Sequence, residues 1–155
     1  MAEKTVPDPS PMEIALDEAR AAEARGEVPV GAVVTRDGAI IARAGNRTRE
    51  LNDPTAHAEI LAIREACRVL GQERLTGLDL HVTLEPCTMC TGAISFARLR
   101  RLYFGAEDPK GGAVIHGGRF FGQPTCHHSP EVYPGIGERE AARLLRQFFQ
   151  DRRGD

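Results

Sequence analysis

Three residues of the sequence have the side chains and the spacing of a metal site. His57 is followed later in the chain by the Cys-x-x-Cys pair Cys87 and Cys90. An imidazole and two thiolates are all zinc ligands, and a site with three protein ligands leaves the fourth tetrahedral position open for water. A closed structural site would use four protein ligands. The pattern therefore predicts one catalytic Zn²⁺ per chain, held by His57, Cys87 and Cys90.

Glu59 is the candidate for proton transfer at this site. It stands two residues after His57, so both side chains can reach a metal that lies beyond the first turn of a helix. A carboxylate within reach of a water at the metal can accept and return protons, which is general acid–base catalysis. We therefore predict that Glu59 is the catalytic residue.

Two helix N-termini are expected to converge on the metal. Pro54 and Thr55 predict the entry and the N-cap of a helix that begins near His57, and Pro86 predicts the entry of a second helix near Cys87. Free backbone N–H groups at a helix N-terminus favour negative charge. Such termini would stabilise the two thiolates and the carboxylate gathered there.

The remaining sequence supplies the elements that position these residues. Apolar periodicity and turn signals alternate along the chain, and Asp37-Gly38 is a hairpin signal between two strands. We predict helices over residues 12–25, 57–70, 87–97 and 138–149, and strands over 28–35, 39–44, 79–84 and 101–105. Helices and strands in this order indicate an α/β domain with helices on both faces of a mixed sheet.

The helix over 57–70 and the segment over 111–136 carry two further expectations. Ile60, Ile63, Cys67 and Leu70 recur at helical spacing and predict a buried stripe. The segment over 111–136 is rich in glycine and has no sustained period, which predicts a loop with at most one short helix. Its Phe120-Phe121 pair either anchors this loop to the core or stacks on a base, and the sequence leaves both open.

Length and composition indicate one soluble domain. The chain has 155 residues, of which 41% are hydrophobic and 27% charged. We predict a flexible N-terminal tail over residues 1–11 and a single domain over 12–153. No apolar run approaches the ~20 residues that span a bilayer, and no secretion signal is evident, so we expect no membrane association and a cytoplasmic location. In that reducing compartment the four cysteines would be free thiols.

The net charge limits how the chain could hold a nucleic acid. Its formal value is −2, which argues against binding through bulk positive charge. Local basic patches remain open. The candidate positions are Arg98, Arg100, Arg101, Lys110, Arg143, Arg146, Arg152 and Arg153.

The motif resembles that of a known enzyme family. His-x-Glu followed by Pro-Cys-x-x-Cys is the signature of zinc-dependent nucleobase deaminases. Four further stretches, residues 27–33, 46–47, 53–60 and 104–110, resemble the bacterial tRNA-specific adenosine deaminases, a branch of the cytidine and deoxycytidylate deaminase superfamily. The resemblance covers residues 12–153.

The resemblance implies a fold, a reaction and partners. The fold would be a three-layer α/β/α sandwich around a mixed five-stranded sheet, as in cytidine deaminase. The reaction would be hydrolysis of wobble adenosine in tRNA to inosine, with release of ammonia. The partners would be a tRNA anticodon stem-loop and a second copy of the chain in a homodimer. The implied substrate-binding residues are Val30, Asn46, Ala58, Asp108 and Lys110.

Two other functions stay open at this point. A deaminase of free cytosine, cytidine or guanine would suit the acidic net charge and would need no basic groove. A non-catalytic, zinc-stabilised nucleic-acid-binding module would use Cys87 and Cys90 as half of a structural site. That module would leave Glu59 without a role.

Overall fold

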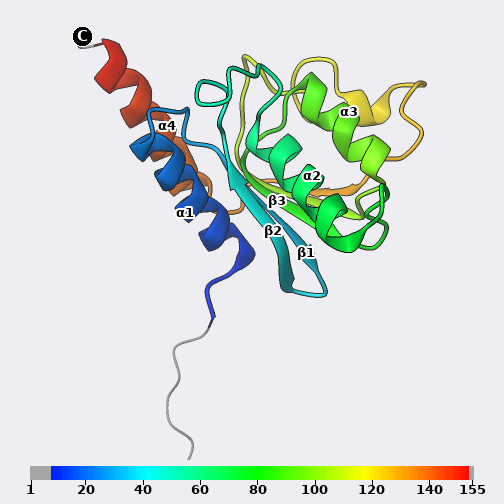
Figure 1. Cartoon of the computed structure of the whole chain (residues 1–155). Helices are drawn as coiled ribbons and strands as arrows, with labels where there is room; N and C mark the ends of the chain where they lie inside the picture. Colours follow the sequence, from blue (N-terminus) through cyan, green and yellow to red (C-terminus); the bar gives the residue numbers. More distant parts are fainter. Residues whose placement is uncertain (1–7, 154–155) are drawn as a thin grey trace, which may run out of the picture.

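The structure, a computed structural model, describes residues 8–153 and contains one mixed sheet with helices on both faces (Figure 1). The strands lie in the order β2-β1-β3-β4-β5. Strand β1 is antiparallel to β2 and β3, whereas β3, β4 and β5 are parallel. The elements in chain order are α1 (Pro11–Ala24), β1 (Gly31–Arg36), β2 (Ala39–Gly45), α2 (Ala58–Leu70), β3 (Asp79–Leu84), α3 (Thr88–Ala97), β4 (Arg101–Ala106), the 3₁₀ helix η1 (Phe120–Gly122), β5 (Glu131–Tyr133) and α4 (Glu138–Arg153).

The helices form two outer layers. Figure 1 shows α1 and α4 on one face of the sheet and α2 and α3 on the other. Each layer has its own core: Ile94, Leu102 and Phe104 belong to the α2–α3 side, and Leu16 and Leu144 to the α1–α4 side. This arrangement confirms the three-layer α/β/α sandwich with a mixed five-stranded sheet.

The segment over 111–136 contains a strand that the sequence did not predict. Strand β5 pairs with β4 in parallel through Arg101 and Glu131, Leu102 and Val132, and Tyr103 and Tyr133. It has only three residues at the sheet edge, which is too short to give an alternating pattern. The expected short helix is present as η1. Within it, Phe121 packs against the core on the α2–α3 side.

Helix α1 begins and packs as its sequence dictates. Ser10 is the N-cap, and it exchanges hydrogen bonds with Glu13 in a capping box. The helix lies directly on β1, because a Cβ atom added at Gly31 would stand 1.9 Å from the carbonyl oxygen of Ala15. Only glycine allows this approach, so the pairing of α1 with the sheet depends on Gly31.

Helix α2 buries a narrower stripe than the one predicted. Its buried residues are Ala58, Glu59, Ala62, Ile63 and Ala66. Of the predicted stripe, Ile63 is buried, Cys67 and Leu70 are partly buried and pack against the core, and Ile60 is partly buried, so the prediction is confirmed in part. The alanines allow α2 to approach the sheet closely, and the larger side chains flank the contact.

The strand directions bring the functional residues to one edge of the sheet. Strands β2, β3 and β4 run in the same direction, and β1 runs in the opposite one. Asn46, Cys87 and Asp108 therefore follow three strand ends at this edge, and Val30 precedes β1 there. Ligands of open α/β sheets bind outside the carboxyl ends of such strands.

The predicted N-terminal tail over residues 1–11 falls largely outside the described residues. Within them, Asp8 to Ser10 are exposed and lead into α1, which already includes Pro11. None of the helices in the described part of the chain is both long and apolar enough to cross a bilayer.

Candidate active site

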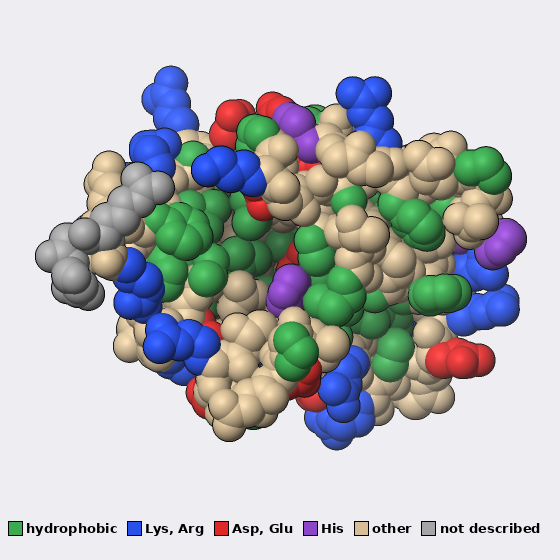
Figure 2. Space-filling view, turned by 90° about the horizontal axis from the view of Figure 1, so that it is seen from above, with side chains coloured by type: hydrophobic (Ala, Val, Ile, Leu, Met, Phe, Trp, Pro, Cys, Tyr) green, Lys and Arg blue, Asp and Glu red, His purple; other side chains and the backbone are tan. Residues whose placement is uncertain are grey.

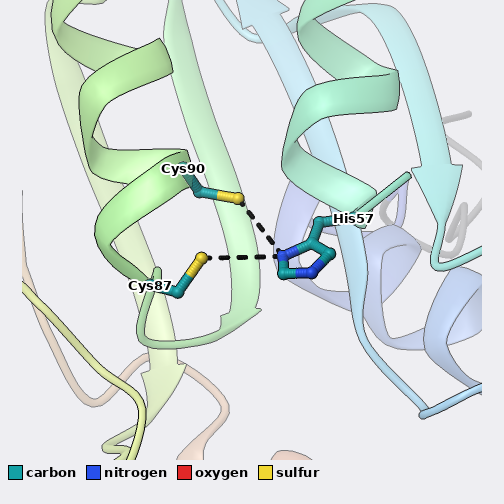
Figure 3. A group of neighbouring side chains, drawn as sticks. All are labelled: His57, Cys87 and Cys90. Atoms are coloured by element: carbon teal, nitrogen blue, oxygen red, sulfur yellow. Dashed lines mark hydrogen bonds between the residues drawn. The ribbon is translucent and has the colours of Figure 1, made fainter. Parts of the chain in front are cut away.

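His57, Cys87 and Cys90 converge between the N-termini of α2 and α3 (Figure 3). Their ligand atoms all lie within 4.8 Å of one another. The Nδ1 atom of His57 is 3.6 Å from each of the two sulfur atoms. A tetrahedral zinc site with Zn–S and Zn–N bonds of about 2.3 and 2.0 Å places N and S about 3.5 Å apart. The three donors therefore fit zinc in type and in spacing.

The two ligand-bearing turns are themselves helix N-caps. His57 caps α2 and Cys87 caps α3, both with extended backbone, and neither side chain is used in a capping hydrogen bond. The prediction that Thr55 would be the N-cap is wrong, because Thr55 bonds Asp53 in a turn before the helix. Both helix dipoles still point at the ligand cluster, as expected, and both side chains are free to bind a metal.

The three side chains of the cluster shift one another's pKa values in opposite directions. The hydrogen bond from Cys90 lowers the pKa of Cys87 to about 4, against the opposing effect of burial, and a hydrogen bond from His57 adds to the lowering. The same bond to Cys87, together with burial, raises the pKa of Cys90. The bond to Cys87 raises the pKa of His57. The cluster alone therefore holds one thiolate, and a divalent cation would stabilise the second.

Glu59 lies in the same pocket and is almost fully buried. Its exposed fraction is 4%. Burial raises the pKa of its carboxyl group, and the negative charge of Cys87 adds to the increase. A raised pKa moves a carboxyl group toward the range in which a general acid–base catalyst works.

These side chains line a small cavity of about 260 Å³. Its walls come from the segments before β1, after β2 and after β4, from the start of α2, and from the end of β3 with the turn that follows it. The lining residues are Val28, Val30, Asn46, Thr48, His57, Glu59, Leu84, Glu85, Cys87, Asp108 and Gly111. Both apolar and polar groups line it, which suits a flat heterocycle with polar edges.

Asn46 joins the loop after β2 to the start of α2. Its Oδ1 atom accepts the N–H of Ala58 at 2.7 Å, so it satisfies one of the free amides of the helix that carries His57 and Glu59. Its own N–H donates to the carbonyl of Val30 at 3.2 Å. No hydrogen bond from its Nδ2 group is found among the described residues, so that group can donate to a ligand.

A family model agrees with this geometry. The model for the cytidine and deoxycytidylate deaminase zinc-binding region matches residues 7–106. The chain belongs to this family. Membership makes the chain a deaminase with a zinc-binding domain, and it accounts for a three-ligand site beside a buried glutamate.

Several individual members of the deaminase family are similar to this chain. A tRNA-specific adenosine deaminase of Agrobacterium fabrum is 69% identical over 144 residues, which cover 93% of this chain and 95% of the relative. One of Aquifex aeolicus is 45% identical and covers 93% of this chain and 95% of the relative. A solved structure from a study of A-to-I editing by tRNA wobble-position deaminases has a TM-score of 0.86 at 70% identity, covering 87% of this chain and 98% of that one. A guanine deaminase of Nitrosomonas europaea has a TM-score of 0.74 at 26% identity, covering 94% and 86%.

The five predicted substrate-binding residues fall into two groups in the structure. Val30, Asn46 and Asp108 line the metal pocket, and the N–H of Ala58 is held by Asn46 at its edge. Lys110 lies outside it, in an adjoining groove of about 790 Å³ that shares Asp108 with the pocket. Their contacts with a substrate stay predictions.

That groove runs from the pocket to α4. It is lined by the apolar side chains of Val28, Leu84, Leu145 and Phe149, and by Lys110 and Arg146 among its polar residues. Figure 2 shows the corresponding face with a hollow at a histidine, hydrophobic side chains beside it, and Lys and Arg side chains around its rim. A deaminase would have room here for more than one nucleotide.

Sequence reasoning missed several residues of the deaminase pocket. Val28, Thr48 and Leu84 carry no chemical signature. Glu85 does carry one, because it is a charged residue directly before Pro86 and Cys87, and it is buried at 2% exposure. Burial raises the pKa of Glu85, but hydrogen bonds from the Asp108 N–H and from His116 outweigh it, so its pKa lies below the usual value.

Proposed function

We propose that this chain is a zinc-dependent hydrolase that converts adenosine at wobble position 34 of tRNA to inosine and releases ammonia. The observation that carries the proposal is the three-ligand cluster beside buried Glu59, in a chain 69% identical to a tRNA-specific adenosine deaminase. His57, Cys87 and Cys90 would hold one zinc ion per chain. When bound, zinc supplies an activated water by lowering its pKa toward neutrality.

Glu59 would carry the protons of the reaction. Water adds to the purine carbon that bears the amino group, and the C–N bond to that group breaks. Glu59 accepts a proton from the attacking water and delivers it to the ring nitrogen; it then takes the remaining proton of the added hydroxyl group and delivers it to the leaving amino group, which departs as ammonia. Its burial keeps bulk water away from these transfers. Asn46 and the N–H-rich start of α2 would orient the purine ring at the cavity edge.

The groove beside the pocket supports an RNA substrate over a free base. A free base needs only the cavity of about 260 Å³. The adjoining groove offers Phe149 and Leu145 for contact with bases, and Lys110 and Arg146 for phosphates. Glu107 and Asp108 also line the groove, so Lys110 and Arg146 are two local contact points for phosphates in a chain of net charge −2, not a positively charged surface.

The basic residues after α3 are not part of that groove. Arg100 makes two hydrogen bonds to Asp79, of 3.0 and 2.9 Å, and Arg101 binds Glu131 at 2.9 Å. Both lie at the N-terminal end of β4. The pocket is at the other end of the strands. RNA binding would therefore depend on the α4 side.

A homodimer and a cytoplasmic location complete the proposal. On α3, Ile94 is core, whereas Phe96 is 81% exposed. The resemblance to the tRNA deaminases motivates a second copy as partner, and we place Phe96 in that contact because it has the highest exposed fraction among the large apolar side chains of the described residues. A substrate tRNA would be met in the cytoplasm.

One assay separates the candidate functions. Purified zinc-loaded protein is offered an anticodon stem-loop with adenosine at the wobble position and, separately, free adenosine, cytidine, cytosine and guanine. The products are identified by mass spectrometry. We expect inosine in the stem-loop and no turnover of the free compounds.

A matched stem-loop with adenosine at a neighbouring position is the control for position. Turnover of guanine or cytosine without the stem-loop would replace the proposal with a free-base deaminase. Inactivity toward every compound, with zinc bound, would favour the non-catalytic binding module.

A further inference from the structure

Glu85 is a buried carboxylate that holds a loop rather than a substrate. Its side chain has an exposed fraction of 0%. One oxygen accepts the N–H groups of Val114, Ile115 and His116, each at 3.1 Å. The other accepts the N–H of Asp108 at 3.0 Å and lies 2.8 Å from Nδ1 of His116. Five donors around one carboxylate match the anion-binding nests that successive backbone N–H groups form.

The loop around Glu85 is shaped to fit it. A Cβ atom added at Gly112 would lie 2.4 Å from the carboxyl carbon of Glu85, so the backbone approaches the carboxylate as closely as glycine permits. The N–H of Ala113 donates to the carbonyl of Pro86 at 2.9 Å. The loop after β4 therefore binds the turn before Cys87 twice: through the side chain of Glu85 and through the backbone carbonyl of Pro86.

The same loop forms the lip of the substrate pocket. Asp108 and Gly111 line the cavity, and Lys110 lines the adjoining groove. Oδ1 of Asp108 accepts the N–H groups of Lys110 and Gly111, at 3.2 and 3.0 Å. The position of Asp108 thus fixes the residues after it, and the Asp108 N–H is itself fixed by Glu85.

We infer that Glu85, with His116, is a positioning residue for substrate binding: it sets the pocket lip at residues 108–111 by anchoring the Asp108 backbone. This inference rests on the proposed function for the identity of the substrate. It assigns Glu85 no contact with the reacting atoms and no proton transfer.

Glu85→Gln tests the anchor with a minimal change of shape. The remaining amide oxygen satisfies the three N–H groups of residues 114–116. The new NH₂ group then faces His116, whose neutral ring can accept at Nδ1, and the Asp108 N–H, which cannot accept. The variant therefore removes the hydrogen bond from the Asp108 N–H and leaves most of the others, now between neutral groups.

Hydrogen–deuterium exchange measures the anchor without any substrate. We expect residues 108–116 of Glu85→Gln to exchange about tenfold faster than in the wild type, the effect of losing one hydrogen bond to a charged group. His116→Ala should loosen the same segment by a smaller factor, and it serves as the second test if Glu85→Gln folds poorly. Glu27→Gln is the matched control, because Glu27 is buried at 1% exposure and binds the N–H groups of Arg49 and Glu50. It should loosen that turn and leave 108–116 unchanged.

Kinetics on the wobble-adenosine stem-loop measure the consequence. With full zinc content, Glu85→Gln should raise KM about tenfold and leave kcat within about twofold, as expected for loss of substrate positioning. Glu65→Gln, on the exposed side of α2 and paired with Arg68, should change neither constant.

Three results would overturn the inference. They are unchanged exchange over 108–116 in both Glu85→Gln and His116→Ala, faster exchange with unchanged KM, and a loss of kcat or of zinc at constant KM. A wild-type protein inactive on the stem-loop would refute the proposed substrate instead, and the exchange comparison would still decide whether Glu85 anchors the loop.

Discussion

Asn46 holds the start of α2 and, under the proposed function, also contacts the substrate; two substitutions can separate these tasks. Its Oδ1 atom accepts the first N–H of α2, that of Ala58, at 2.7 Å in a partly buried position. Asn46→Ala removes this acceptor and leaves the helix amide without a partner, which costs about 1–2 kcal/mol. For a chain of 155 residues, that loss corresponds to a decrease in Tm of about 2–8 °C. Thermal unfolding in excess zinc measures it.

Asn46→Asp keeps an acceptor for the Ala58 N–H, replaces the Nδ2 donor with an oxygen and adds a negative charge to the pocket. An aspartate oxygen can accept the Ala58 N–H, and its charge is favourable at a helix N-terminus, so we expect a Tm within about 2 °C of the wild type. The lost Nδ2 donor should raise KM for the stem-loop at least about tenfold. Wild-type stability of Asn46→Ala, or wild-type kinetics of Asn46→Asp, would refute this division of tasks.

Three further perturbations test separate parts of the account. Burial lowers the pKa of His81 from 6.5 to about 4, so the neutral imidazole contributes fully to folding stability above pH 6.5, and this contribution is lost as the pH falls through 4. The contribution is about 3 kcal/mol. The free energy of unfolding of His81→Gln in urea should therefore depend less on pH over that range than that of the wild type, and parallel curves would contradict the argument. Glu59→Ala should retain zinc and lose at least roughly 10²–10⁴-fold in turnover; near-normal turnover of the zinc-loaded variant would remove Glu59 from catalysis. Phe96→Asp places a charge at a side chain that is 81% exposed, and sedimentation at micromolar concentration should shift from dimer to monomer; an unchanged dimer would place the contact elsewhere.

Much of the fold follows from local sequence signals. All four α-helices begin within one residue of the predicted positions, because each start has a proline, a capping residue or a change of periodicity. The hairpin at Asp37-Gly38 is present, and both residues have positive φ angles of 49° and 83°, as this turn requires. Local chemistry determines these features, so the sequence alone is sufficient to predict them.

Tertiary context determines the features that the sequence did not reveal. Strand β5 exists because the edge of β4 is open to pairing, and its own three residues carry no pattern. The α2 stripe consists mostly of alanines because the sheet lies close, so the larger side chains are at its margins. The task of Glu85 depends on backbone N–H groups more than twenty residues away in the chain, and no spacing rule connects them.

Part of the candidate site could likewise be predicted from the sequence, and part could not. The metal ligands and Glu59 are recognisable because few side chains can do this chemistry and their spacing is characteristic. The groove toward α4 is made by Leu145, Phe149 and Arg146, which are far in sequence from the motif. An amphipathic helix also needs such residues for packing, so only the structure distinguishes the two uses.

The central claim is that three side chains hold a zinc ion with one coordination position left for water beside Glu59. Zinc K-edge X-ray absorption of the purified protein tests it most directly. We predict a shell of two sulfur atoms at about 2.3 Å and two lighter atoms, one nitrogen and one oxygen, at about 2.0–2.1 Å in the wild type, and loss of the bound zinc in Cys87→Ser. A third sulfur, a second imidazole nitrogen in the place of the oxygen, or protein that binds no zinc would contradict the claim.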